Sequence, residues 1–188
     1  MGELADNLTA VANGEPAERA DNISKTNDDH IEQYWVDTRK MALTGLKDSY
    51  QQLYNQTLRL SEDDLASLEF FPWQNGRPVW RIIAGNGTLH PLSYMAGYTS
   101  KHTGIKRILD AYEAVLPRLA ELEEIPGWQA LLQHDLACIC AIVGQKKRAI
   151  HSLGASLRLS PDFSAWTQQN LDLDSLRGES EEYEALFP

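Results

Sequence analysis

The chain has 188 residues, of which 43% are hydrophobic and 23% are charged, and its formal net charge at pH 7 is −10. This composition is that of a globular protein with enough apolar surface for a core, and at roughly 150 residues per domain the length fits one domain with a tail. The negative charge argues against DNA or RNA as a partner, because nucleic-acid binders neutralise phosphates with clustered Lys and Arg. Two cysteines are too few for a disulfide framework, and no apolar run reaches the roughly 20 residues that a membrane-spanning helix needs.

The N-terminal segment carries much of the negative charge. Residues 1–37 hold nine acidic residues against Arg19 and Lys25, and few large apolar residues precede Ile31. Such a segment cannot offset its ordering entropy by burial, so we predict a disordered acidic tail over residues 1–26 and a single helical domain over 27–188. The N-terminus does not resemble a secretory signal, and we expect a cytoplasmic protein that does not contact a membrane.

The first half of the predicted domain is helical in pattern. From Asp28 to Leu60 many apolar residues recur at intervals of three or four, the period of an α-helix, and no proline interrupts them. We predict one long helix there, with Gly45 as the place where it can break. Ser61 precedes three acidic residues, which is typical of a helix start, and predicts a short helix over 62–69.

The next segment, residues 70–98, is rich in Gly, Pro and aromatic residues, so we expect an irregular insertion there. Within it, residues 77–84 and 88–92 flank Gly85-Asn86-Gly87 and can form a small β-hairpin. Large aromatic residues beside Gly and Pro more often pack a loop onto a helical body than line a ligand pocket. The aromatic residues concerned are Phe70, Phe71, Trp73, Trp80, Tyr94 and Tyr98. The helical period then returns over 105–125.

Residues 130–163 (ALLQHDLACICAIVGQKKRAIHSLGASLRLSPDF) hold the strongest pattern of the chain. They resemble a tetratricopeptide repeat (TPR), a helix-turn-helix unit of about 34 residues with small residues where its helices touch and a closing proline. Ala137 and Ala149 allow the helices to approach, Gly144 can adopt a left-handed helix end, and Pro161 cannot continue a helix. The other matching positions are Leu136, Cys140, Leu153 and Ser156, while Gln133, Ala137, Cys140 and Leu153 depart from the preferred residue types of the family.

Residues 164–188 resemble the segment that closes TPR arrays in many bacterial proteins, so the resemblance covers residues 129–188. It implies a mostly α fold of antiparallel helical hairpins of the α-solenoid type. Since a solenoid unit buries its apolar face only against neighbours, the helices at 28–60 and 105–125 can stack as degenerate repeats.

The resemblance also implies a function, because TPR domains hold a peptide or protein segment in a groove lined by their first helices. The groove positions fall on Leu131, His134, Cys138 and Ile142. We therefore expect a protein-interaction or scaffold module with a protein or peptide partner, which can also be a subunit of a larger assembly. The groove lacks the Lys, Asn and Arg set with which chaperone-tail binders clamp a terminal carboxylate.

Chemistry at the same residues is the alternative to partner binding. His134 and Cys138 lie four residues apart, a spacing that suits a zinc site or a thiol–imidazole pair. A zinc site needs a second ligand pair and a cysteine nucleophile needs an oxyanion site, and neither is evident. We expect no catalytic residue, no metal and no cofactor. The alternative function is a small-ligand or enzymatic domain formed by residues 61–104, with the TPR-like end as an appendage.

Overall fold

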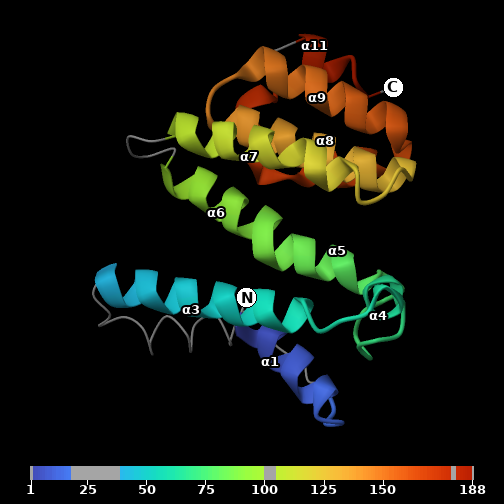
Figure 1. Ribbon diagram of the computed structural model, residues 1–188. Helices are drawn as coiled ribbons and strands as arrows, with labels where there is room; N and C mark the ends of the chain where they lie inside the picture. The colour runs from blue at the N-terminus through green and yellow to red at the C-terminus, as the bar shows by residue number, and fades with distance from the viewer. Residues whose placement is uncertain (1, 18–38, 100–104, 179–180, 188) are drawn as a thin grey trace. The chain divides into compact units, whose positions relative to one another are not determined.

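The computed structural model describes residues 2–17, 39–99, 105–178 and 181–187 (Figure 1). The chain is mostly helical, as predicted, and no β-strand occurs in these described residues. It divides into two compact units, Met1–Thr88 and Leu89–Pro188, where we expected one domain from residue 27 onward. Residues 18–26 of the predicted tail and residues 28–38 of the predicted long helix lie outside the described residues.

In the first unit, part of the predicted tail is helical. Helix α1 spans Gly2–Ala12, so the prediction of disorder is wrong for this stretch. Leu4 and Leu8 lie one helical turn apart and are buried in a cluster with Phe71 and with Leu53 of the next described helix, α3 (Arg39–Thr57). Few apolar residues suffice here, because they share one face of the helix.

Helices α3 and α4 follow the sequence pattern closely. Helix α3 spans Arg39–Thr57 without a break at Gly45, and α4 spans Glu62–Ala66. Ser61 caps α4 as predicted. Its Oγ accepts a hydrogen bond from the Asp64 backbone N–H at 3.1 Å, and its own backbone N–H donates to Asp64 Oδ2 at 2.9 Å. These hydrogen bonds to the carboxylate hold the pKa of Asp64 below its ordinary value.

The predicted β-hairpin is wrong, because the residues concerned are helical. Helix α5 (Val79–Ala84), a π-helical turn (Gly85–Leu89) and helix α6 (His90–Thr99) follow one another. Gly85 has a right-handed φ of −59°, and the Asn86 side chain donates to the Ile82 carbonyl at 3.0 Å. Apolar side chains at helical spacing are buried along this stretch, and their burial outweighs the turn propensity of Gly-Asn-Gly. They are Val79, Ile82, Ala84, Leu89, Leu92 and Ala96.

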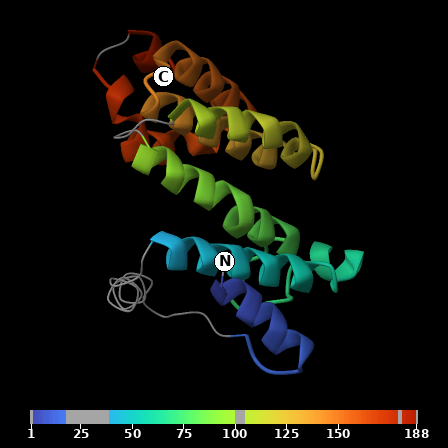
Figure 2. The same ribbon diagram turned by 60° about the vertical axis from the view of Figure 1, so that its left-hand side comes forward.

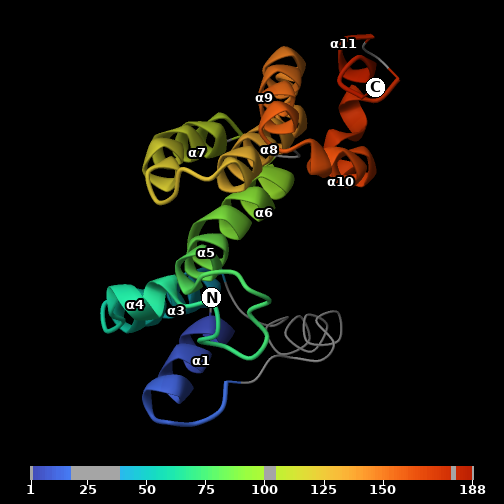
Figure 3. The same cartoon turned by 90° about the vertical axis from the view of Figure 1, so that its right-hand side faces the viewer.

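The second unit contains the segment with the TPR-like pattern. Helix α7 contacts both α6 and α8, α8 also contacts α6, and α8 pairs with α9. The closing segment, residues 164–188, follows α9, and Figures 2 and 3 show α7 on one side of the α8–α9 pair, with α10 on the other in Figure 3. The elements are α7 (Ile105–Ala120), α8 (Pro126–Ile142), α9 (Lys146–Leu159), η2 (Pro161–Phe163), α10 (Ser164–Gln169), η3 (Leu171–Leu176) and α11 (Glu181–Glu184).

The helix-turn-helix predicted for residues 130–163 is present as α8 and α9. Gly144 has a φ of +78°, a conformation in which glycine avoids the steric cost of a side chain. Ala137 and Ala149 are fully buried, and Ser156 Oγ donates to the Ala130 carbonyl at 2.8 Å across the pair. Small residues therefore let the two helices approach closely, as the sequence predicted.

Candidate functional site

The four residues predicted to line a groove lie on one face of α8, but this face is not open. His134 and Cys138 are 0% and 6% exposed, while Leu131 and Ile142 are half-buried. The chain's own closing segment covers this face, since η3 packs on α8. Where the sequence predicted a free groove for a partner, the structure packs the closing segment of the same chain against α8.

Aromatic stacking joins α8 to the start of the closing segment. The imidazole of His134 stacks on the indole of Trp166, with ring centroids 3.9 Å apart and planes inclined by 20°. The ring of Phe163 meets both rings edge-on, at 6.3 Å from His134 and 5.4 Å from Trp166. Such stacking contributes beyond the area it buries, so this trio anchors one end of the closing segment.

The other end of the contact combines buried leucines with hydrogen bonds. Leu173 and Leu176 of η3 are completely buried. Ser175 Oγ donates to the Ala141 carbonyl at 3.3 Å, and Asn170 Nδ2 donates to Cys138 Sγ at 3.4 Å. The face of α8 thus holds a short segment by apolar burial together with polar contacts to both backbone and side chain.

The thiol and imidazole of this face are neutral. Cys138 Sγ lies 3.6 Å from His134 Nδ1. Burial lowers the pKa of His134 to about 4, and it raises the pKa of Cys138 well above its ordinary value, with the carboxylates of Asp135 and Asp172 adding to the increase. A nucleophilic cysteine needs a thiolate stabilised by nearby positive charge, and this environment does the opposite.

A pair of like charges lies at the same contact. Burial, and second the carboxylate of Asp172 in η3, raise the pKa of Asp135 on α8 to about 7. On the α7 side, Tyr112 donates its hydroxyl to the Leu132 carbonyl at 3.0 Å, and its pKa is raised mainly by burial and next by Asp135. Neither carboxylate is paired with a Lys or Arg among the residues that the structure describes. Burial and this acidic neighbour therefore favour the protonated form of Asp135.

Within the part of the chain that the structure describes, three buried polar atoms of the same region are without a hydrogen-bond partner: His134 Nε2, Thr167 Oγ1 and Arg177 Nε. Arg177 uses its terminal nitrogens instead, pairing with Asp174 and donating to the Asn170 carbonyl at 2.6 Å. Buried polar groups are nearly always satisfied in folded proteins, so these three atoms are exceptions within an otherwise well-buried contact.

The aromatic segment of the first unit forms a packed loop, as predicted for Phe70, Phe71 and Trp73. The Phe71 ring stacks on Trp73 at 4.7 Å and meets Phe70 edge-on at 5.0 Å. Gln74, which sequence reasoning did not single out, organises the loop. Its amide donates to the Ser67 and Arg77 carbonyls, and its Oε1 accepts from the Phe71 N–H at 2.8 Å. By contrast, Tyr94 is largely exposed, and the side chain of Tyr98 lies outside the described residues.

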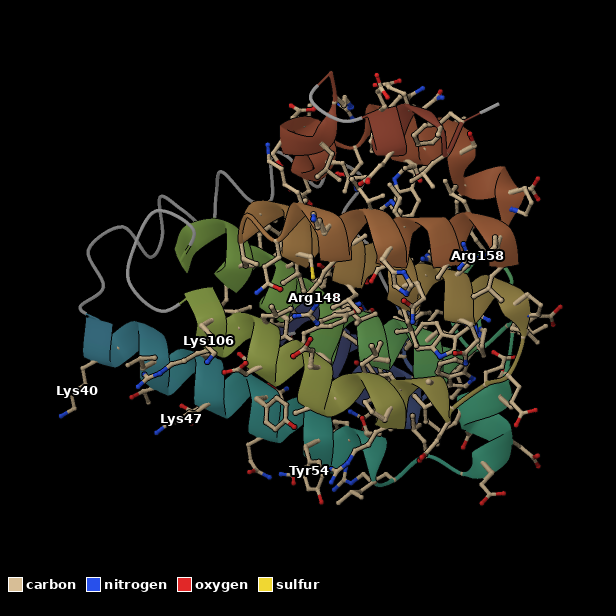
Figure 4. The ribbon with its side chains drawn as sticks, turned by 90° about the horizontal axis from the view of Figure 1, so that it is seen from above. Lys40, Lys47, Tyr54, Lys106, Arg148 and Arg158 are labelled. Carbon is tan, nitrogen blue, oxygen red and sulfur yellow. The ribbon has the colours of Figure 1, made fainter. Side chains whose placement is uncertain are left out.

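Helix α3 presents an exposed apolar face. Residues spaced by three or four positions are about half exposed or more along this face, and Lys40, Lys47 and Tyr54 project from the same side of the helix (Figure 4). Contiguous exposed apolar side chains mark contact surfaces more often than inert surface. The residues are Leu43, Leu46, Tyr50, Tyr54 and Leu58.

The basic block at the start of α9 is exposed and includes an ion pair. Lys146, Lys147 and Arg148 are all exposed, and Arg148, labelled in Figure 4, pairs with Glu113 of α7. Exposed pairs of this kind contribute little to stability. This pair connects α9 to α7 at the surface.

Among the described residues, no group of three or more His, Cys, Asp and Glu side chains can hold a metal ion. No helix in this part of the chain is both long enough and apolar enough to cross a membrane. Comparison of the chain with protein-family models, with curated proteins and with solved structures finds no match.

Proposed function

We propose that this chain is a TPR-like protein-interaction module that binds a short segment of a partner protein on the face of α8 and carries out no catalysis itself. The TPR-like pattern of residues 130–163 supports this proposal. So do the pairwise contacts of α6, α7, α8 and α9, because stacked helical hairpins contact their neighbours in this order. A cytoplasmic location and a place in a larger assembly fit the same proposal.

The observation that carries the proposal is the segment already seated on α8. Residues 170–176 bury Leu173 and Leu176 and donate to the Ala141 carbonyl and to Cys138. A peptide in a protein groove is held in the same way, by apolar anchors with a few well-placed polar contacts. A partner segment with leucines at the same spacing can occupy this face when the closing segment leaves it.

The experiment is to empty the face and offer it a segment in trans. The double variant L173S/L176S removes the two buried anchors from the chain, and a fluorescent synthetic peptide of residues 164–178 is the probe. We expect the variant to bind the peptide at least about tenfold more tightly than the unaltered chain, whose own segment competes. Fluorescence anisotropy measures the binding.

Two controls make the result specific. Leu171 is 77% exposed, so L171S should leave the closing segment seated and behave as the unaltered chain. Circular dichroism must show that L173S/L176S keeps its helices. A helical variant that binds the peptide no better than a scrambled peptide contradicts the proposed function.

A further inference from the structure

The exposed apolar face of α3, which we call the α3 face, is large enough to be a contact surface. Its five side chains are between 48% and 67% exposed, whereas Leu53 of the same helix is buried in a cluster with Leu4 and Leu8 of α1. Together the five expose on the order of 500 Å², near the upper end for a patch on a monomer. With polar neighbours such as Lys47 the face approaches the roughly 800 Å² that each partner buries in a stable dimer. The five residues are Leu43, Leu46, Tyr50, Tyr54 and Leu58.

The residues of the α3 face are arranged almost symmetrically about Tyr50. Leu46 and Tyr54 lie four residues before and after it, and Leu43 and Leu58 lie seven before and eight after. An antiparallel copy of the same helix therefore places Leu46 opposite Tyr54 and Leu43 opposite Leu58. Each of these contacts then occurs twice, and Tyr50 meets Tyr50 at the two-fold axis, as a dimer with two-fold symmetry requires.

The charges beyond the two ends of the α3 face are complementary. Lys40 lies ten residues before Tyr50, and Glu62 and Asp63 lie 12 and 13 residues after it. They begin α4, which lies beyond the C-terminal end of α3 (Figures 1 and 2). Lys40, Glu62 and Asp63 are exposed and make no ion pair within the described chain. Antiparallel pairing brings opposite charges together at both ends, whereas parallel pairing brings Lys40 to Lys40.

We infer that a second copy of this chain occupies the α3 face. The two copies form an antiparallel, two-fold symmetric dimer with Tyr50 at its centre, and at each end Lys40 of one copy meets Glu62 and Asp63 of the other. The same two carboxylates disfavour an anionic lipid surface as the occupant. The dimer is independent of the proposed function, because it uses a different helix in the other unit.

The first experiment measures dimerisation of the full chain by sedimentation velocity in the micromolar range. We expect a dimer, and we expect Tyr50→Glu to raise its dissociation constant at least about tenfold, because two carboxylates then meet at the two-fold axis. Asn55→Glu is the matched control. It adds the same charge at an exposed position, about 140° around the helix from Tyr50. This control should leave the dissociation constant within about twofold, and circular dichroism must show that both variants keep their helices.

The second experiment tests the antiparallel register by exchanging charges. K40E and E62K/D63K should each weaken the dimer at least about fivefold, since each variant places like charges together at both ends. An equimolar mixture of the two variants should form a mixed dimer as tight as that of the unaltered chain, because opposite charges again meet at both ends. High salt should reduce these differences.

Four outcomes would each overturn the inference. They are a chain that stays monomeric in the micromolar range, a Tyr50→Glu variant that dimerises as tightly as Asn55→Glu, a mixture of the charge variants no tighter than either variant alone, and a monomeric chain that binds anionic phospholipid vesicles unless Tyr50 is replaced by Glu. The last outcome would assign the α3 face to a lipid surface.

Discussion

The imidazole of His134 stacks on the indole of Trp166, 32 residues further along the chain, with ring centroids 3.9 Å apart. The TPR pattern places His134 in a partner groove. Through this contact, His134 is instead part of the packing between α8 and the closing segment. Because the stacked ring excludes water, it also sustains the burial that lowers the His134 pKa to about 4. The stacking and the neutral imidazole are thus two consequences of one contact.

Trp166→Ala should therefore loosen the closing segment and restore water to His134. Trp166 is 45% exposed, so we expect the free energy of unfolding to fall by about 1 to 2 kcal/mol, less than for a fully buried tryptophan. The His134 pKa should rise toward its ordinary value of 6.5. Urea denaturation and an NMR titration of His134 measure the two effects. An unchanged His134 pKa in a folded variant would show that the indole does not shield the ring.

For Asp135 we predict a pH dependence of stability that is opposite to that of an ordinary surface carboxylate. Its folded pKa of about 7 exceeds its model-compound value of 3.8, so the folded state binds the proton more tightly. Stability from this group is fully present below pH 3.8 and is lost as the pH rises through 7. Asp135→Asn, which stays neutral, should raise the free energy of unfolding at pH 8 by about 1 to 2 kcal/mol and leave it little changed at pH 4.

Chemical denaturation of Asp135→Asn and the unaltered chain at pH 4, 6 and 8 tests this. The groups that face Asp135 are Asp172 on η3, Tyr112 on α7 and Cys138 on α8. The pKa values of Tyr112 and Cys138 are raised above their already high ordinary values, so neither group titrates in this range. Asp172→Asn is the companion variant, and it should give a smaller gain at pH 8 because it removes the repulsion but leaves Asp135 buried. Loss of stability at pH 8 in both variants would contradict the like-charge account.

For His134 we predict the reverse pH dependence of stability, over nearly the same pH range. Its folded pKa of about 4 lies below 6.5, so the unfolded chain binds the proton more tightly and stability falls as the pH drops from 6.5 toward 4. His134→Phe keeps a ring to stack on Trp166 but cannot be protonated. Relative to the unaltered chain, this variant should gain about 1 to 3 kcal/mol between pH 6.5 and 4.

The effects of His134 and Asp135 oppose each other between about pH 4 and 6.5, so their sum in the unaltered chain is nearly flat. Only the single variants separate them. Urea denaturation across this range gives the unfolding free energy of each variant and of the unaltered chain. The contribution of the other carboxylates cancels in the difference between the two. If His134→Phe shows the same pH dependence as the unaltered chain, His134 is not buried and neutral in solution.

The elements that could be predicted from the sequence are those with local causes. Ser61 caps α4 because its partner is three residues away, and Gly144 ends α8 because the turn needs a positive φ. The small residues Ala137 and Ala149 likewise mark a close helix pair within one repeat. Spacing and residue type carry this information directly, so the helix-turn-helix of residues 130–163 follows from the sequence.

The rest depends on contacts between distant segments or on competition between two local preferences. Nothing near Cys138 in the sequence indicates that Asn170 will contact it, so the covering of the α8 face was not predictable. Charge and composition led to the prediction of a disordered tail where α1 forms. Leu4 and Leu8 are few, but their spacing places them on one face of this helix. In the segment around Asn86, the turn propensity of the sequence competes with the burial of apolar side chains on a helix. The hydrogen bond that the Asn86 side chain donates to the Ile82 carbonyl belongs to the helical conformation.

Gln74 is a residue that sequence reasoning missed and that organises a loop of the first unit. It is completely buried, and three backbone groups of its loop depend on its amide: the carbonyls of Ser67 and Arg77 and the N–H of Phe71. Gln74→Ala leaves all three without this partner, which should cost about 2 to 4 kcal/mol because unsatisfied buried backbone groups are expensive. The Phe71 side chain, packed against α1 and α3, should loosen with the loop. Protease sensitivity and hydrogen exchange of residues 67–77, together with thermal unfolding, test this.

Asn75→Ala, at an exposed neighbouring position with a φ of 54°, is the matched control and should cost about 1 kcal/mol through backbone strain alone. Equal effects of the two substitutions would mean that the Gln74 hydrogen bonds do not hold the loop.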